Sequence, residues 1–85
     1  MLKKEFIVRM ENGLHARPAA ELVKGLKPFS STIELYSKSK KYNPKSIVSL
    51  MTANIKEGQL IQVTVNGEDE KELMQWIDEF FSKDK

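Results

Sequence analysis

The sequence predicts an α+β fold in which an antiparallel sheet has one face in water and helices packed on its other face. Three observations predict it: the element order is β-α-β-β-α-β-α, the strands alternate apolar and polar residues, and the helical segments carry apolar stripes. The 85 residues contain no repeat, low-complexity tract or linker, so we expect one domain spanning residues 1–85.

The first two elements are a strand and a helix. Residues 4–10, "KEFIVRM", alternate enough to form a half-buried strand. In residues 17–27 the apolar side chains instead recur at steps of three and four, which predicts a helix. Pro28 is compatible with an end of the helix near that residue. The apolar stripe of this helix consists of Ala19, Leu22, Leu26 and Phe29.

The middle of the chain predicts a hairpin and a short helix. Residues 31–36, "STIELY", are rich in strand-forming residues, and residues 40–43, "KKYN", are the expected return strand. The turn between them has no glycine and is a weak hairpin signal. Ser46 is suited to cap the next helix, and Asn54 is suited to close it in the left-handed conformation.

The last two elements are a strand and a helix. Residues 59–65, "QLIQVTV", are the clearest strand of the chain. The final helix opens with Asp69 and Glu72 at the spacing of a capping box, and its late Lys83 and Lys85 complement the helix dipole. The helical residues expected in the core are Leu22, Leu26, Leu73, Trp76, Ile77 and Phe80.

The composition excludes several classes of protein. The chain has no cysteine, so neither disulfides nor thiolate metal sites are expected. With one histidine, and with carboxylates that lack a binding-loop spacing, we expect no metal site. No apolar run is long enough to cross a membrane and no leader precedes the first strand, which favours a cytoplasmic protein.

The charge is distributed unevenly along the chain. Residues 1–56 carry eleven Lys or Arg and four Asp or Glu, a balance of +7, whereas residues 57–85 carry three and eight, a balance of −5. A basic first half fits an acidic partner or a phosphate group, although an uneven solvated surface gives the same pattern. Direct nucleic-acid binding is disfavoured, because the basic residues are not interleaved with stacking aromatic residues.

The segment "NGLHARPAA", residues 12–20, places a histidine and an arginine at the expected start of the first helix. A proline biases the residue before it away from helical dihedrals, so this helix should begin at about Pro18. The backbone amides of Ala16 and Arg17 would then point outward without partners, at a helix end that attracts phosphate-like anions.

Arg17 has the wrong sign for the first turn of a helix, where the macrodipole favours acids. Local rules of this kind tend to be broken at functional sites. An anion held by the guanidinium and the free amides would resolve the conflict, and Gly13 gives the loop freedom to place the His15 imidazole there. We therefore expect reversible phosphorylation of His15; the alternative is a surface or capping histidine.

A docking surface is expected beside this histidine. Small apolar residues followed by lysines on the outer face of the first helix would fit a partner with an apolar patch and an acidic rim. The short second helix extends this surface if its apolar residues are not all needed in the core; otherwise they are ordinary core and solvent residues. The candidates are Ala16, Ala20, Val23, Lys24 and Lys27 in the first helix and Ile47, Val48 and Met51 in the second.

Two motifs resemble those of the HPr family, the histidine-containing phosphocarriers of the bacterial phosphoenolpyruvate-dependent sugar phosphotransferase system. "GLHARPA" (13–19) is similar to the active-site motif, and "KSIVSLM" (45–51) resembles the regulatory-serine segment. The similarity runs from the first strand to about residue 82. It implies an open-faced β-sandwich, in which a four-stranded antiparallel sheet is covered on one side by three helices.

The resemblance also implies a function. Enzyme I would transfer a phosphoryl group from phosphoenolpyruvate to His15 at Nδ1, and the group would pass to enzyme IIA domains. Arg17 would stabilise the phosphoryl group in transfer. Such a carrier turns over only with its partners, so we expect a monomer with no enzymatic activity of its own and no cofactor beyond the transient phosphoryl group.

Ser46 is expected to be a second modification site. In Gram-positive relatives HPr kinase/phosphorylase modifies this serine, and the product binds a catabolite-control repressor; the resemblance implies the same partners here. A phosphate on Ser46 would place negative charge on the docking surface and weaken the binding of acidic partners. The alternative is a serine that only caps its helix.

Two other functions stay open at this point. An HPr-like protein of this kind can serve a nitrogen branch or act as a corepressor instead of serving sugar uptake, although relatives that act only as corepressors often lack the histidine. A hydrolytic enzyme is disfavoured, because His15 has no serine and aspartate constellation recognisable in the sequence.

Overall fold

A computed structural model describes residues 1–82 and confirms the predicted element order. One sheet contains all four strands, in the spatial order β1-β4-β2-β3, and every neighbouring pair is antiparallel. The elements are β1 (Leu2–Ile7), α1 (Ala16–Leu26), β2 (Thr32–Ser37), β3 (Lys40–Tyr42), α2 (Ile47–Ala53), β4 (Leu60–Asn66) and α3 (Glu70–Ser82).

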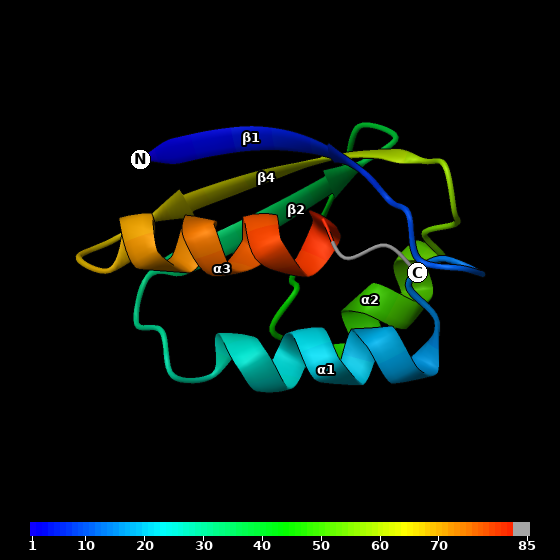
Figure 1. Cartoon of the computed structure of the whole chain (residues 1–85), viewed down its shortest axis with the longest axis horizontal. Coiled ribbons are helices and arrows are strands. Elements are labelled where there is room, and N and C mark those ends of the chain that lie inside the picture. Colours follow the sequence, from blue (N-terminus) through cyan, green and yellow to red (C-terminus); the bar gives the residue numbers. More distant parts are fainter. Residues whose placement is uncertain (83–85) are drawn as a thin grey trace.

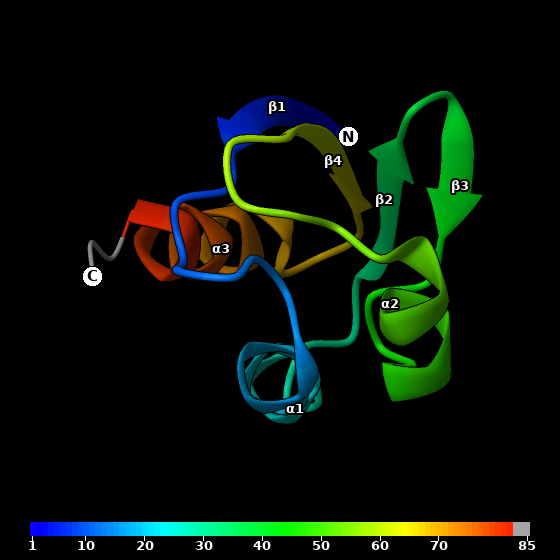
Figure 2. The same cartoon turned by 90° about the vertical axis from the view of Figure 1, so that its right-hand side faces the viewer.

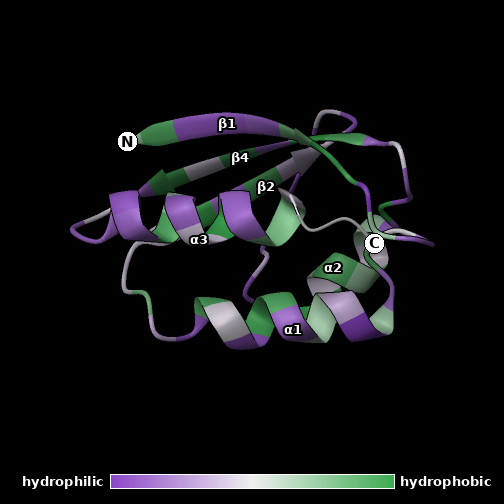
Figure 3. Cartoon of the chain, in the orientation of Figure 1, coloured by the Kyte–Doolittle hydropathy of each residue, from purple (hydrophilic) through white to green (hydrophobic). Residues whose placement is uncertain are grey.

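The three helices lie on one face of the sheet and leave the other face open (Figures 1 and 2). The strand sequences explain this arrangement, because alternate residues of a strand point to opposite faces. Ile61, Val63 and Val65 of β4 are buried beneath the helices, whereas the residues between them reach the open face. In Figure 3, green segments alternate with paler or purple ones along β4. The open-faced β-sandwich predicted from the sequence is therefore confirmed.

The helices contribute the rest of the core, each through one stripe of apolar side chains that faces the sheet. The stripe of α1 is buried as predicted, except that Phe29 beyond its end is only half-buried. Trp76 was expected in the core, but it is half-buried and packs against the edge of the core. The buried residues of α3 are Leu73, Ile77, Phe80 and Phe81. Within residues 1–82, no helix has the length and apolar character needed to cross a bilayer.

The first strand and the first helix both begin earlier than predicted. β1 starts at Leu2 and ends at Ile7, although Val8 stays buried and bonds through its amide to the Gln59 carbonyl at 3.0 Å. α1 begins at Ala16 and not at Pro18. A proline in the first turn forfeits no hydrogen bond, since the amides of that turn lack helical partners in any case.

The β2–β3 hairpin is closed by a turn without glycine. Lys38 and Ser39 have φ values of 53° and 70°, in the left-handed region. Two-residue hairpin loops favour positive φ because the resulting twist matches that of the flanking strands. The antiparallel register, with Ser37 opposite Lys40, therefore imposes a conformation that these two residues do not favour by themselves.

The start of α3 does not form the predicted capping box. The Asp69 carboxylate accepts hydrogen bonds from the Ser30 amide at 2.9 Å and the Ser31 amide at 3.0 Å, and also from the Ser31 hydroxyl. Glu70, not Glu72, reaches back to an amide, that of Gly67 at 3.1 Å. Asp69 is thus used to hold the loop before β2, and the predicted contributions of Lys83 and Lys85 lie outside the described residues.

Candidate functional site

His15 is the N-cap residue of α1 and its side chain is exposed. Its backbone is extended, with φ −85° and ψ −167°, and its carbonyl accepts the first bond of the helix from Ala19 at 2.9 Å. The imidazole makes no capping hydrogen bond. Among the described residues 1–82, neither ring nitrogen of His15 takes part in a hydrogen bond, so both stay available to a ligand.

Gly13 shapes the loop before His15 through a left-handed backbone conformation and a close contact with another loop. Its φ is +74°, and a Cβ atom there would overlap the carbonyl oxygen of Ile55 and lie 2.6 Å from Cα of Lys56. The next residue, Leu14, is buried and donates to the Ile55 carbonyl at 3.0 Å. The positive φ of Gly13 agrees with the conformational freedom expected of a glycine here, and the close contact with residues 55–57 leaves no room for a larger residue.

The start of α1 offers an uncompensated positive site. Within residues 1–82, the amides of Ala16 and Arg17 donate no hydrogen bond, and Pro18 has no amide hydrogen. The first turn contains no acidic residue, and in the described part of the chain the exposed Arg17 forms no ion pair. Free amides at a helix N-terminus, with an exposed arginine in the same turn, are features that attract a phosphate-like anion.

The expected docking residues lie on two adjacent helices. α1 and α2 pack beside each other on the same side of the molecule (Figure 2). On α2, Val48 is 72% exposed, and Ile47 and Met51 are also exposed. The first helix and its C-cap contribute the exposed Ala16, Ala20, Lys24 and Lys27 and the half-buried Val23. Together with the three residues of α2, we call these the docking face.

Ser46 caps the neighbouring helix. Its hydroxyl oxygen accepts from the Ser49 amide at 3.2 Å, and Asn54 closes the helix with φ 51° and ψ 50°. Both capping predictions for this helix are confirmed. The serine is half-buried and lies directly before the exposed Ile47 and Val48. A group added to its hydroxyl would therefore adjoin the docking face.

Lys45 and Ser49 support α2 through contacts that the sequence pattern does not predict. The Lys45 ammonium donates to the carbonyls of Phe29 at 3.0 Å and Ser31 at 3.3 Å, which ties the start of α2 to the loop after α1. Ser49 accepts from the Asn43 amide at 2.8 Å. The spacing of residues along the sequence does not predict these hydrogen bonds, because each bond joins a side chain to the backbone of a different segment. Within residues 1–82, no three acidic or histidine side chains cluster in a way that could hold a metal ion.

Comparison with known proteins assigns this fold and site to one family. Residues 2–83 match the family described as the PTS HPr component phosphorylation site. The chain is 41% identical to the phosphocarrier protein HPr of Xylella fastidiosa over 81 residues, which cover 95% of this chain and 91% of that one. It is 39% identical to the HPr of Borreliella burgdorferi over 84 residues, covering 94% and 98% of the two chains.

Solved structures agree with the sequence matches. The crystal structure of the phosphocarrier protein HPr from Bacillus anthracis superposes with a TM-score of 0.90 at 32% identity, covering 95% of this chain and 96% of that one. The fold and the matches, which run along almost the whole chain, define the class of protein as a phosphocarrier. The chain belongs to the HPr family.

Proposed function

We propose that this protein accepts a phosphoryl group from phospho-enzyme I on His15 and donates it to enzyme IIA domains of the sugar phosphotransferase system. The observation that carries the proposal is that, within residues 1–82, the His15 imidazole, the amides of Ala16 and Arg17 and the Arg17 guanidinium all lack partners at the start of one helix. The family implies the partners, and the geometry of this chain supports the role of each residue.

The chemistry follows from the site. Nδ1 of a neutral imidazole attacks phosphorus, so that a nitrogen–phosphorus bond forms at His15 while the bond between phosphorus and the donor breaks. The charge on the phosphoryl oxygens is met by the Arg17 guanidinium and by the amides of Ala16 and Arg17. Transfer to enzyme IIA reverses these steps. The carrier needs no cofactor and acts only together with its partners, which would place it in the cytoplasm with them.

The docking face is suited to transient binding of partner proteins, with charge guiding their association. Exposed Lys24 and Lys27 follow small and aliphatic side chains along the first helix, which suits a partner with an apolar patch and an acidic rim. Three exposed aliphatic residues of α2 extend it. A small polar interface of this kind favours fast association and fast release, and a monomer suits a shuttle between two partners.

Ser46 is the proposed regulatory residue. A phosphate there would add roughly −1.5 to −2 charges next to the exposed part of α2. That charge repels an acidic partner, so modification by HPr kinase/phosphorylase would reduce transfer through His15 while creating a ligand for a catabolite-control repressor.

Incubation with enzyme I and phosphoenolpyruvate tests the proposal. We expect an acid-labile phosphate on His15 that enzyme IIA discharges. His15→Ala should abolish acceptance and keep the fold, and Arg17→Glu should slow transfer by about a hundredfold. Lys71→Glu, on the distant and exposed start of α3, is the matched charge control and should transfer at the normal rate. An unmodified His15, or a normal rate in Arg17→Glu, contradicts the proposal.

A further inference from the structure

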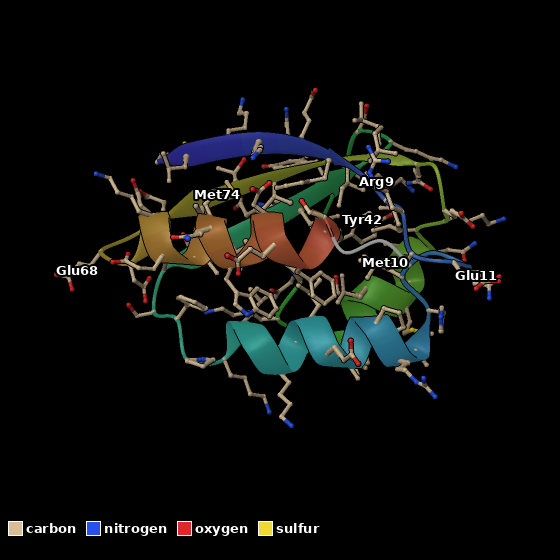
Figure 4. The ribbon with its side chains drawn as sticks, in the orientation of Figure 1. Arg9, Met10, Glu11, Tyr42, Glu68 and Met74 are labelled. Carbon is tan, nitrogen blue, oxygen red and sulfur yellow. The ribbon has the colours of Figure 1, made fainter. Side chains whose placement is uncertain are left out.

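The loop between α2 and β4 runs beside the connection from β1 to α1, which ends at His15 (Figure 1). We call this connection, residues 8–15, the histidine loop. Its inner turn is closed by the Gly13 amide, which donates to the carbonyl of Met10 at 2.9 Å (Met10 is labelled in Figure 4). Backbone atoms of residues 55–57 lie so close to Gly13 that a Cβ atom would not fit there. We call this contact the clamp.

The histidine loop is bonded to the same neighbour at both of its ends. Near its end, the Leu14 amide donates to the Ile55 carbonyl at 3.0 Å. At its start, the Val8 amide donates to the Gln59 carbonyl at 3.0 Å, and the Gly58 amide donates to the Val8 carbonyl at 2.7 Å. The position of the histidine loop therefore depends on what holds the loop between α2 and β4 in place.

The side chain of Gln59 braces this supporting loop against the sheet. Its Oε1 accepts from the Lys56 amide at 3.2 Å, and its Nε2 donates to the hydroxyl of Ser37, the last residue of β2. A backbone amide can only donate, so the contact with Lys56 fixes which end of the carboxamide is the oxygen. Because Ser37 is buried, the far end of the brace is anchored inside the fold.

No other side chain of the supporting loop can replace this brace. Within residues 1–82, Gln59 is the only member of residues 56–59 whose side chain forms a hydrogen bond or an ion pair. The three residues before it are exposed, whereas Ile55 is buried. Among side chains, the segment that presses on Gly13 is therefore held by Ile55 at one end and by Gln59 at the other.

We propose that Gln59 is a positioning residue for phosphoryl transfer at His15, an inference that rests on the proposed phosphocarrier function. By holding residues 55–57 against Gly13, it keeps the imidazole beside the free amides of the first turn of α1. A displacement of about 1 Å at a reacting group can slow a reaction by about a hundredfold. Gln59 is not part of the docking face, so its loss should slow transfer and leave partner binding unchanged.

Single-turnover transfer from phospho-enzyme I, followed by rapid quench, tests the proposal. Gln59→Leu removes both side-chain bonds and keeps a similar volume. We expect the rate at saturating phospho-enzyme I to fall about tenfold, and the half-saturating concentration to change by less than about twofold.

Two control variants should transfer at the normal rate. Gln62→Leu is the matched control, because Gln62 lies three positions further along the chain, is half-buried and forms no side-chain hydrogen bond within residues 1–82. Val65→Ala is the stability control, because Val65 is buried near the far end of β4 and its truncation destabilises the fold without touching the supporting loop.

A double-mutant cycle with Ser37 tests whether the brace acts as a unit. Ser37→Ala removes the anchor of Nε2 and should slow transfer about threefold, a result that stands even if Gln59→Leu does not fold. Adding Ser37→Ala to Gln59→Leu should slow transfer no further, because the bond is already absent. Effects that multiply would show that the two residues act separately, and would overturn the proposal.

Spectra of ¹⁵N-labelled protein provide a readout that does not depend on enzyme I. In Gln59→Leu, the amides of residues 13–17 and the ring nitrogens of His15 should shift. In Val65→Ala they should stay in place, although that variant is less stable. Shifts confined to the neighbours of residue 59 in the sequence overturn the proposal, because the brace would then not reach the histidine loop.

Each outcome of the rate measurements also decides the proposal. A normal saturating rate in Gln59→Leu overturns it, and so does equal slowing in Val65→Ala, since loss of stability would then be the cause. A change confined to the half-saturating concentration assigns Gln59 to partner binding and overturns it as well. If the parent protein takes no phosphate on His15, the phosphocarrier function itself fails. A phosphorylated parent with an equally fast Gln59→Leu variant overturns only the role of Gln59.

Discussion

Gly25 of α1 and Trp76 of α3 meet so closely that no side chain fits between them. A Cβ atom on Gly25 would overlap Cζ2 and Cη2 of the indole and would lie 2.9 Å from Cε2. The indole also stacks on Phe80, with ring centroids 5.4 Å apart and planes inclined by 19°. Glycine costs about 1 kcal/mol relative to alanine inside a helix. The packing of Trp76 against Gly25 therefore offsets the low helix propensity of this glycine in α1.

Gly25→Ala should destabilise the protein, although alanine is the better helix former. The gain of about 1 kcal/mol in helix propensity is outweighed by overpacking, which costs about 1–3 kcal/mol when a ring must move. Urea denaturation followed by circular dichroism measures the change. Because Trp76 is the single tryptophan, its fluorescence should shift to the red as the indole is displaced toward water.

A double-mutant cycle separates the two effects. In a Trp76→Leu background the clash is absent, so Gly25→Ala should become stabilising by up to about 1 kcal/mol. If the alanine is equally destabilising in both backgrounds, the indole is not the cause.

The two left-handed glycines at 13 and 58 provide a matched pair for the clamp on the histidine loop. A Cβ atom on Gly13, whose φ is +74°, would meet backbone atoms of residues 55–57, whereas a Cβ atom on Gly58, whose φ is +87°, would meet no atom of another described residue within 4 Å. Gly58→Ala should cost about 1 kcal/mol for the conformation alone. Gly13→Ala should cost about 3 kcal/mol or more, since the loop must also move, and should slow phosphorylation of His15. Equal losses of stability in the two variants would show that the clamp has no energetic role.

Elements fixed by neighbouring residues could be predicted from the sequence. The cap at Ser46 and the left-handed closure at Asn54 are local choices of single residues, and both were located correctly. The alternation of β4 likewise depends on consecutive residues, and the strand lies within one residue of its predicted bounds. The motif around His15 identified the candidate site for the same reason.

Features that depend on distant residues could not be predicted. The spacing of Asp69 and Glu72 suggested a capping box, yet the Asp69 carboxylate bonds to Ser30 and Ser31, nearly forty positions earlier in the chain. The half-buried position of Trp76 depends on Gly25 in another helix. Helical periodicity identifies a face, but it does not say how deeply that face is buried.

Asp69→Asn should change the pH dependence of the free energy of unfolding. The bond from the Ser31 hydroxyl, followed by that from the Ser30 amide, lowers the pKa of the Asp69 carboxyl below its ordinary value of 3.8. The stabilisation is therefore complete above that value and is lost as the pH falls through the lower pKa of the folded state. The variant should be less stable at neutral pH and should lose less stability on acidification.

Denaturation midpoints measured from neutral pH down to about pH 2 provide the comparison. Asp78→Asn is the control, because Asp78 pairs with Lys4 at 2.7 Å on the surface, where both side chains are nearly half exposed. Ion pairs on the protein surface contribute little to the free energy of unfolding, so this variant should follow the acid dependence of the parent protein. If both variants follow the acid dependence of the parent protein, the Asp69 bonds do not stabilise the fold.

Replacements at Ser46 separate its capping role from its proposed regulatory role. Ser46→Ala removes the acceptor for the Ser49 amide and should cost about 1 kcal/mol, with transfer through His15 unchanged. Ser46→Asp keeps a capping oxygen at the helix start and should retain stability, yet it places a negative charge beside the exposed Val48. Transfer from enzyme I should then slow, and the difference should shrink at high salt because the repulsion is screened. A normal rate in Ser46→Asp at low ionic strength would show that charge at this position does not reach the docked partner, and phosphorylation of Ser46 could then regulate transfer only by steric means.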